Sequence, residues 1–330
     1  MAARLAVSAC LLACSLVAAS AASGAPGDDP VRPQPPTSAE VERSTQRFLA
    51  REGDHREAGG AVADAAAGTG GVGQGGGGGG GTFPGRRMIA LYGAPQMTAT
   101  ILGRKSVGAA KKQARKQASK YKGEGRPVVP GLDLVATIAT ADRGGDGKYR
   151  DRQSNGVIER YFDAAREIDG HLMLDIQPGR SSFISELKAH REWISRPDVD
   201  VALDPEWNVG KKGKPGKTTG KVTAKELNKI SSFISDLTER EDLPPKALVI
   251  HQFRQGSVKN RDKIKQPDGV QVTLNFDGIG SRSAKAAGYR RLTRDGLFAG
   301  FSLFYRLDKG LMSPKQVAGL DPTPDFVLYQ

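Results

Sequence analysis

The chain has 330 residues, of which 38% are hydrophobic and 26% charged, and its formal net charge is +13. No zinc-finger, RNP-type or helix-turn-helix pattern accompanies this basic charge, so we expect no nucleic-acid partner. The chain has only two cysteines, Cys10 and Cys14. If the segment that holds them is removed, the mature protein has no disulfide, thiol nucleophile or thiolate metal site.

The N-terminus has the pattern of a secretory signal peptide over residues 1–22. A basic start at Met1–Arg4 precedes an apolar run at Leu5–Ala18 and a small-residue cleavage site at Ala19–Ala21. The apolar run is too short for a membrane span. Residues Leu11–Cys14 also resemble a lipobox, in which Cys14 would carry lipid. We therefore expect an extracellular or cell-envelope protein that contacts the membrane only through such an anchor.

Residues 23–85 have the composition of a flexible linker. They contain several prolines, an Ala/Gly-rich stretch and seven consecutive glycines from Gly75 to Gly81. Such a segment buries too little apolar surface to offset the entropy of ordering it. It is typical of a tether between a signal or anchor and a folded domain.

The folded domain is expected over residues 86–330, about 245 residues, which is the usual size of a (β/α)8 barrel. Eight apolar, β-rich runs occur there: Arg87–Tyr92, Leu132–Ala139, His171–Ile176, Val199–Leu203, Ala247–His251, Val270–Phe276, Phe298–Phe304 and Phe326–Tyr329. Most are continuous apolar runs, as in parallel strands that are buried on both faces. The predicted fold is therefore α/β, a TIM-like barrel.

Helical patterns separate these strands. The longer ones are Thr98–Tyr121, Ser154–Ile168, Ser181–Ser195 and Thr223–Arg240, and shorter ones lie at Ser257–Ile264, Ser283–Arg290 and Ser313–Ala318. Thr223 begins a Thr-x-x-Glu capping-box pattern. Alternating strands and helices predict a parallel sheet with right-handed crossovers. The short last helices predict an irregular end of the barrel.

Two segments carry much of the positive charge, Arg104–Arg126 and Lys211–Lys221. On an exported protein, a basic surface favours anionic envelope polymers or lipid head groups. A solvated helix face and a solubilising loop explain the same residues equally simply.

A barrel of this type has its active site at the carboxyl ends of its strands. Polar side chains follow six of the predicted strands there: Tyr92; Asp175, Gln177 and Arg180; Asp204, Glu206 and Trp207; His251, Gln252 and Arg254; Asn275 and Asp277; and Tyr305. Charged groups are costly to bury unpaired, so we expect them to face a wet pocket or to pair with one another. The pairs Asp175–Arg180 and Asp277–Arg254 are the structural alternative.

Glu206 is the sharpest candidate for a catalytic acid. Its neighbour Trp207 is apolar, and an apolar environment raises the pKa of a carboxyl group and keeps it protonated. Asp175, Asp204 and Asp277 supply further carboxylates, and two carboxylates that flank one bond are the requirement of glycoside hydrolysis. Trp207 is also explained by ordinary packing.

A metal site remains open as an alternative, whereas a serine nucleophile has no supporting motif. Asp175, Asp204, Glu206, His251 and Asp277 are suitable ligands for Mg²⁺ or Ca²⁺, although no His-x-His or His-Glu-x-x-His spacing accompanies them. No Gly-x-Ser-x-Gly motif indicates a serine nucleophile. His171 and His190 are expected to be structural or exposed.

Two resemblances follow from these motifs. Leu174–Arg180 (LDIQPGR), Ala202–Trp207 (ALDPEW) and Ile250–Arg254 (IHQFR) resemble a group of exported, lipoprotein-like bacterial proteins, which implies a shared fold and export but no reaction. Asp204-x-Glu206 is similar to the end of the chitinase-like glycoside hydrolase motif, which implies that Glu206 is the acid and Asp204 its assistant. Ala202 stands where that motif has an earlier Asp.

We therefore expect a glycoside-hydrolase-like barrel that acts on or binds a surface polysaccharide, with no cofactor and no assigned metal. Glu206 is the acid, with Asp175 or Asp277 as base or stabiliser. Trp207, Tyr92 and Tyr305 are sugar platforms, and Arg180 and Arg254 position anionic groups. The alternatives are a non-catalytic carbohydrate- or anion-binding protein and a metal-dependent hydrolase of phosphoesters or acyl groups.

Overall fold

The computed structural model describes residues 81–293 and 296–330. The expected signal peptide, Cys10, Cys14 and the linker up to Gly80 lie outside the described residues. Within the described part, no helix is both long enough and apolar enough to cross a membrane.

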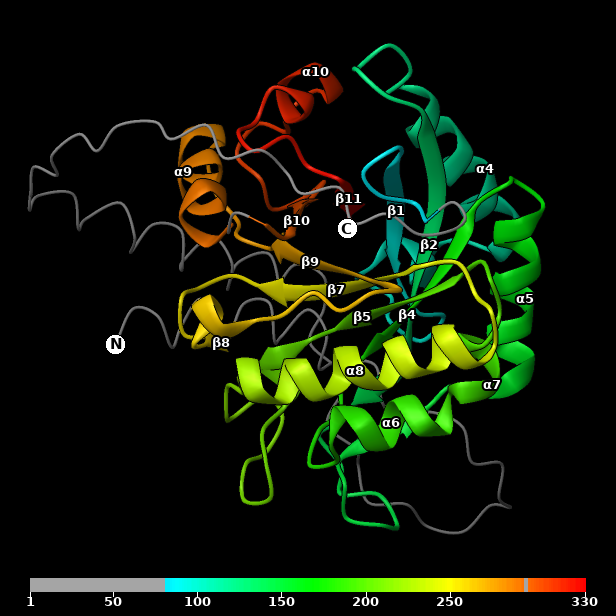
Figure 1. The fold of residues 1–330 in the computed structure, drawn as a ribbon, viewed down its shortest axis with the longest axis vertical. Helices are drawn as coiled ribbons and strands as arrows, with labels where there is room; N and C mark the ends of the chain where they lie inside the picture. Colours follow the sequence, from blue (N-terminus) through cyan, green and yellow to red (C-terminus); the bar gives the residue numbers. More distant parts are fainter. Residues whose placement is uncertain (1–80, 294–295) are drawn as a thin grey trace, which may run out of the picture. The chain divides into compact units, whose positions relative to one another are not determined.

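The domain is a closed barrel of eight parallel strands, as the sequence predicts (Figure 1). The strands are β1 (Arg87–Gly93), β2 (Val128–Ala139), β4 (His171–Ile176), β5 (Val199–Leu203), β7 (Lys246–Gln252), β9 (Val270–Phe276), β10 (Phe298–Leu303) and β11 (Phe326–Tyr329). Each pairs with the next, and β1 pairs with both β2 and β11, which closes the sheet. A short strand, β3 (Arg150–Arg152), adds antiparallel to the end of β2.

Helices fill the connections between the strands. They are α3 (Ile101–Arg104), α4 (Val107–Ser119), α5 (Asn155–Arg166), α6 (Phe183–Ala189), α7 (Arg191–Ile194), α8 (Ala224–Arg240), α9 (Arg282–Leu292) and α10 (Pro314–Ala318). In α8 the residues Leu227, Ile230, Ile234 and Leu237 are buried, as their spacing on one face predicts. The Thr223 hydroxyl caps this helix by accepting from the amide of Glu226 at 3.2 Å.

The capping box predicted at Thr223 is only half formed. The Glu226 carboxylate accepts from Asn208 Nδ2 at 3.3 Å, so this side chain links the start of α8 to the loop that follows β5.

Three helix predictions need correction. The segment 181–195 forms the two helices α6 and α7, with His190 between them. The segment 98–121 forms two helices, because the Ser106 side chain caps a second one by accepting from the amide of Ala109. The segment 257–264 contains no α-helix but the short strand β8 (Val258–Lys259) and the 3-10 turn η2 (Arg261–Lys263). Asn260 between them has φ 53°, which interrupts a right-handed helix, and β8 pairs with β6 (Val222–Thr223). The barrel is therefore irregular between β7 and β9 as well as at the short α10.

The amino ends of the strands form the floor of the barrel, which contains buried cations. Lys246 is fully buried, and its ammonium donates to the carbonyl oxygens of Arg196 and Val199, the latter at 2.9 Å. Arg87 is also buried and donates to the carbonyl oxygens of Pro324 and Glu124, each at 3.0 Å. These carbonyl partners satisfy the buried charges, so the floor is structural.

Phe301 in β10 provides a test of the packing between the barrel and α9. Its ring stacks on Phe276 with centroids 6.2 Å apart and meets the edge of Tyr289 at 5.4 Å. We expect Phe301→Ala to lower the free energy of unfolding by about 3–5 kcal/mol, because a buried ring leaves a cavity. Urea denaturation followed by circular dichroism measures the change. A loss below about 1 kcal/mol would show that the region repacks.

Candidate active site

A polar layer lies at the carboxyl end of the barrel. Successive strands contribute Tyr92 (β1), Asp133 (β2), Asp175 (β4), His251 (β7), Asn275 (β9) and Ser302 (β10), all of them at most 4% exposed. Alternate residues of a barrel strand face the interior. Polar groups gathered there are unusual for a barrel core, where branched apolar side chains dominate.

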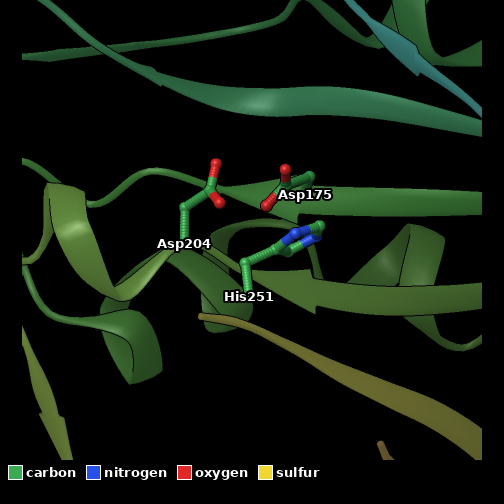
Figure 2. A group of neighbouring side chains, drawn as sticks. All are labelled: Asp175, Asp204 and His251. Carbon is green, nitrogen blue, oxygen red and sulfur yellow. The ribbon is translucent and has the colours of Figure 1, made fainter. Parts of the chain in front are cut away.

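Two aspartates and a histidine form the centre of this layer. One carboxylate oxygen each of Asp175 and Asp204 and one ring nitrogen of His251 all lie within 4.8 Å of one another. Figure 2 shows the two carboxyl groups close together, with the imidazole of His251 beside them. Neither oxygen of Asp175 has a hydrogen-bond partner among the described residues.

Asp204 is held in place from two sides. It follows the last residue of β5, and its Oδ2 accepts from Gln177 Nε2 at 2.9 Å and from the Tyr92 hydroxyl at 3.3 Å. Gln177 also donates to the Tyr92 hydroxyl at 3.2 Å. Gln177 and Tyr92 therefore orient this carboxylate.

His251 is oriented by the acid that follows β9. Its Nδ1 donates to Asp277 Oδ2 at 2.7 Å, and Asp277 Oδ1 accepts from Asn275 Nδ2 at 2.7 Å and from the Ser302 hydroxyl. Burial opposes the charged imidazolium, but Asp277 and Asp204 outweigh burial and raise its pKa well above the usual value. Asp277 is thus occupied with positioning, and His251 is the cation of the cluster.

Burial keeps several of the acids protonated. It raises the pKa of Asp133 to about 8, with Asp204 and Asp277 adding to the effect and His251 opposing it. Burial, followed by the charge of Asp204, likewise raises the pKa of Asp175. A site that holds uncharged carboxyl groups at neutral pH is equipped for general acid catalysis.

Glu206 stands at the edge of this cluster in the 3-10 turn η1 (Pro205–Trp207). Pro205 begins the turn, and the amide of Trp207 donates to the carbonyl of Asp204 at 3.1 Å. Burial, then the charges of Asp204 and Asp277, raise the pKa of Glu206 well above the ordinary value. Its Oε2 is enclosed and has no hydrogen-bond partner among the described residues.

The predicted sugar platforms are mostly wrong. Trp207 is only 3% exposed and Tyr92 only 4%, so neither ring presents an open face for stacking. Trp207 packs in the core, and Tyr92 contributes its hydroxyl. Tyr305 is 37% exposed, its hydroxyl donates to Gln117 Oε1 at 3.1 Å, and its ring lies 5.3 Å from that of Tyr329. Its role as a sugar platform stays a prediction.

Other predicted site residues have structural partners. The Gln252 side chain donates to the carbonyl of Leu292 at 2.7 Å, so it supports α9 and is not available for substrate. Arg180 and Arg254 lie over the rings of Tyr149 and Phe253. Neither arginine forms an ion pair with Asp175 or Asp277 in the part of the chain that the structure describes. The structural alternative of paired rim charges is therefore wrong.

The sequence analysis missed Asp133 and Ser302. Asp133 has no hydrogen-bond partner on either oxygen among residues 81–293 and 296–330. The signal was an acid inside an otherwise apolar strand, which is rare without a function or a partner. Ser302, which bonds Asp277 and Asn275, gave no such signal. His171 and His190 are structural as expected: His171 forms a hydrogen bond with Asp200, and His190 forms one with Thr137.

The same groups also fit a divalent cation. Asp175, Asp204 and His251 supply carboxylate oxygen and imidazole nitrogen, and both suit such ions. His251 Nε2 has no partner among the described residues, while its Nδ1 donates to a carboxylate. This arrangement, in which a carboxylate orients a histidine, is common among metal-binding histidines.

Asp133→Asn tests the electrostatics of the layer. The folded pKa of about 8 lies above the unfolded value near ~4, so the contribution of Asp133 to stability is complete below pH ~4 and is lost as pH rises toward 8. Asparagine cannot ionise, so the variant should lose less stability over this range than the unaltered protein, by about 2 kcal/mol or more. Urea unfolding at several pH values measures it.

A matched control is Asp200→Asn on the floor side, where the buried acid accepts from the amide of Ala247 at 2.7 Å and from His171 at 2.8 Å. Removing these charge-assisted bonds should destabilise the protein. Parallel pH curves for Asp133→Asn and the unaltered protein would contradict the raised pKa of Asp133.

Comparisons with known proteins identify no family for the chain. No protein-family model matches the chain, and no curated protein matches it. Among solved structures, it is similar to a noncanonic maltogenic alpha-amylase from Thermotoga neapolitana, at 13% identity and a TM-score of 0.27. The match covers 67% of this chain and 59% of the amylase chain.

Proposed function

We propose that this protein is a cell-envelope glycoside hydrolase in which Glu206 is the general acid and the Asp175–Asp204 pair is the base or stabiliser. The observation that carries the proposal is the placement of Glu206, in the turn directly after β5, beside the neighbouring carboxyl groups of Asp175 and Asp204 at the carboxyl end of the barrel. Its proposed location rests on the signal peptide and linker that the sequence predicts at residues 1–85.

Each residue has a chemical task in this proposal. Glu206 donates its proton to the oxygen that leaves when the glycosidic bond breaks. Asp204, fixed by Gln177 and Tyr92, stabilises positive charge at the anomeric carbon. Water adds to that carbon, and the Asp175–Asp204 pair accepts the proton that the water loses. Asp277 holds His251 and is too fully hydrogen-bonded to be the base.

The first test is Glu206→Gln, measured by release of reducing ends from envelope polysaccharide. We expect turnover to fall by about 100-fold or more, because the amide cannot donate the proton, while the fold and polymer binding are retained. The control is Glu226→Gln, which changes another half-buried Glu with a raised pKa, bonded to Asn208 and outside the acid cluster. Equal losses in both variants would contradict the role of Glu206.

The pH profile gives an independent check. The active form of Glu206 is protonated, and its pKa is raised by burial and by Asp204. Activity should therefore persist at neutral pH and fall as pH rises through that raised pKa. A profile that instead increases steadily from pH 5 to 9 would exclude Glu206 as the acid.

The cation-compatible geometry favours a second candidate, a metal-dependent hydrolase of phosphoesters or acyl groups. In that case Mn²⁺, Zn²⁺ or Ca²⁺ should raise the melting temperature, because a ligand that binds only the native state stabilises it. EDTA should reverse the shift, and Asp175→Asn should abolish it. The glycosidase proposal expects no effect of either additive, so thermal melting separates the two.

The third candidate is a non-catalytic carbohydrate-binding protein. It predicts that Glu206→Gln and the unaltered protein bind polymer equally and that neither releases reducing ends. Turnover by the unaltered protein would exclude this candidate.

A further inference from the structure

Three loops meet beside the acid cluster and form what we call the basic rim. They are residues 140–149 between β2 and β3, residues 177–182 after β4, and residues 208–221 after η1. Gly179 and Asn208 form a parallel bridge, and the amide of Arg180 donates to the carbonyl of Lys148 at 2.7 Å. The rim is therefore held together by backbone contacts between loops far apart in the sequence.

Gly179 makes this close approach feasible. Its φ is +60°, and an added Cβ would lie 2.4 Å from the carbonyl oxygen of Tyr149 and 2.5 Å from that of Lys148. Only glycine allows the backbones to touch in this way.

The rim is strongly positive. Its cations are Arg143, Lys148, Arg180, Lys211, Lys212, Lys214, Lys217 and Lys221, and its acids are Asp142 and Asp146. Asp146 pairs with Arg150 of β3 and is thus already neutralised. None of the rim cations forms an ion pair within the described residues. Their field is therefore directed at solvent, where it attracts anions.

Part of this charge is anchored. The Arg180 guanidinium lies 4.3 Å from the centre of the Tyr149 ring, and its Nε donates to the carbonyl of Gly213 at 2.6 Å. The ammonium of Lys214 lies 5.8 Å from the same ring. The stack thus joins all three loops through one aromatic side chain, which gives the positive groups a defined place.

The rim continues directly into the acid cluster. Gln177 begins the second loop and bonds Asp204, while the amide of Gly220 in the third loop donates to the carbonyl of Glu206 at 2.6 Å. An anionic group would be repelled by the carboxylates and attracted by the rim. A polymer spanning both would place its charged groups beside the rim.

We propose that the basic rim binds the charged groups of an anionic polysaccharide and so sets the substrate class of the neighbouring site. This inference rests on the proposed function for the identity of the polymer as a glycan. The chemistry recognised is the repeated negative charge of a sugar chain, for which polygalacturonate is the probe.

Binding to polygalacturonate tests the inference, measured by isothermal titration calorimetry on the full chain with Glu206→Gln, so that turnover plays no part. The rim variant is K211E/K212E/K217E, which changes three exposed lysines. The matched control is K112E/R115E/K116E, which reverses the same number of exposed charges on α4. We expect the rim variant to weaken binding about tenfold or more and to flatten its salt dependence, with the α4 variant changing it less than about twofold.

Several outcomes would overturn the inference. Equal losses in the two variants would show unspecific attraction to net charge. Equal binding of neutral dextran would show that charge is irrelevant, and tighter binding of polyphosphate would show that the rim is not selective for a glycan. The proposed function can fail separately from this inference. If the unaltered protein hydrolyses no envelope polymer but polygalacturonate binding still depends on the rim, the proposed function is wrong and the rim assignment stands.

Discussion

The cost of removing carboxyl groups from water is the constraint on which the carboxyl end of this barrel, its mouth, depends. Asp133, Asp175 and Asp204 are at most 4% exposed; Asp175 and Asp204 lie close to one another, and the charge of Asp133 acts on Asp175. Three ionised carboxylates cannot share such a volume, because their mutual repulsion adds to the desolvation of each. The site resolves this conflict with bound protons and the cation His251. The protonation states that the proposed acid catalysis requires are thus a consequence of where the strands place these residues.

The surrounding side chains differ from one acid to the next. Burial raises the pKa of Asp204, while the charge of His251 and the donor from Gln177 oppose this effect. Donors from His251, Asn275 and Ser302 surround Asp277. Asp175 and Asp133 receive no comparable donors. Similar residues thereby acquire different roles, and the differences arise from neighbours on other strands of the barrel.

The sequence predicted the barrel well and the details of its mouth less well. Strands buried on both faces are continuous apolar runs, and β4, β5, β9 and β11 have the predicted bounds for that reason. The wrong expectations depend on tertiary contacts: the burial of Trp207, the bond from Gln252 to α9, and the left-handed Asn260 that prevents a helix. Polar residues after strands were recognisable because a barrel exposes them at one end. Asp133 lies deeper, within β2, where position alone did not mark it.

The two ends of the barrel differ in whether their buried polar groups have hydrogen-bond partners. At the floor, Lys246 and Arg87 each donate to backbone carbonyls, as in a region selected for stability. At the mouth, Asp133, Asp175, Glu206 and His251 keep polar atoms without hydrogen-bond partners in the described part of the chain. Leaving such atoms unpaired costs stability, about 1–3 kcal/mol each. A fold that satisfies cations at one end can satisfy acids at the other, so we expect the unpaired atoms at the carboxyl end to bond a partner from outside the chain: water, a substrate or an ion.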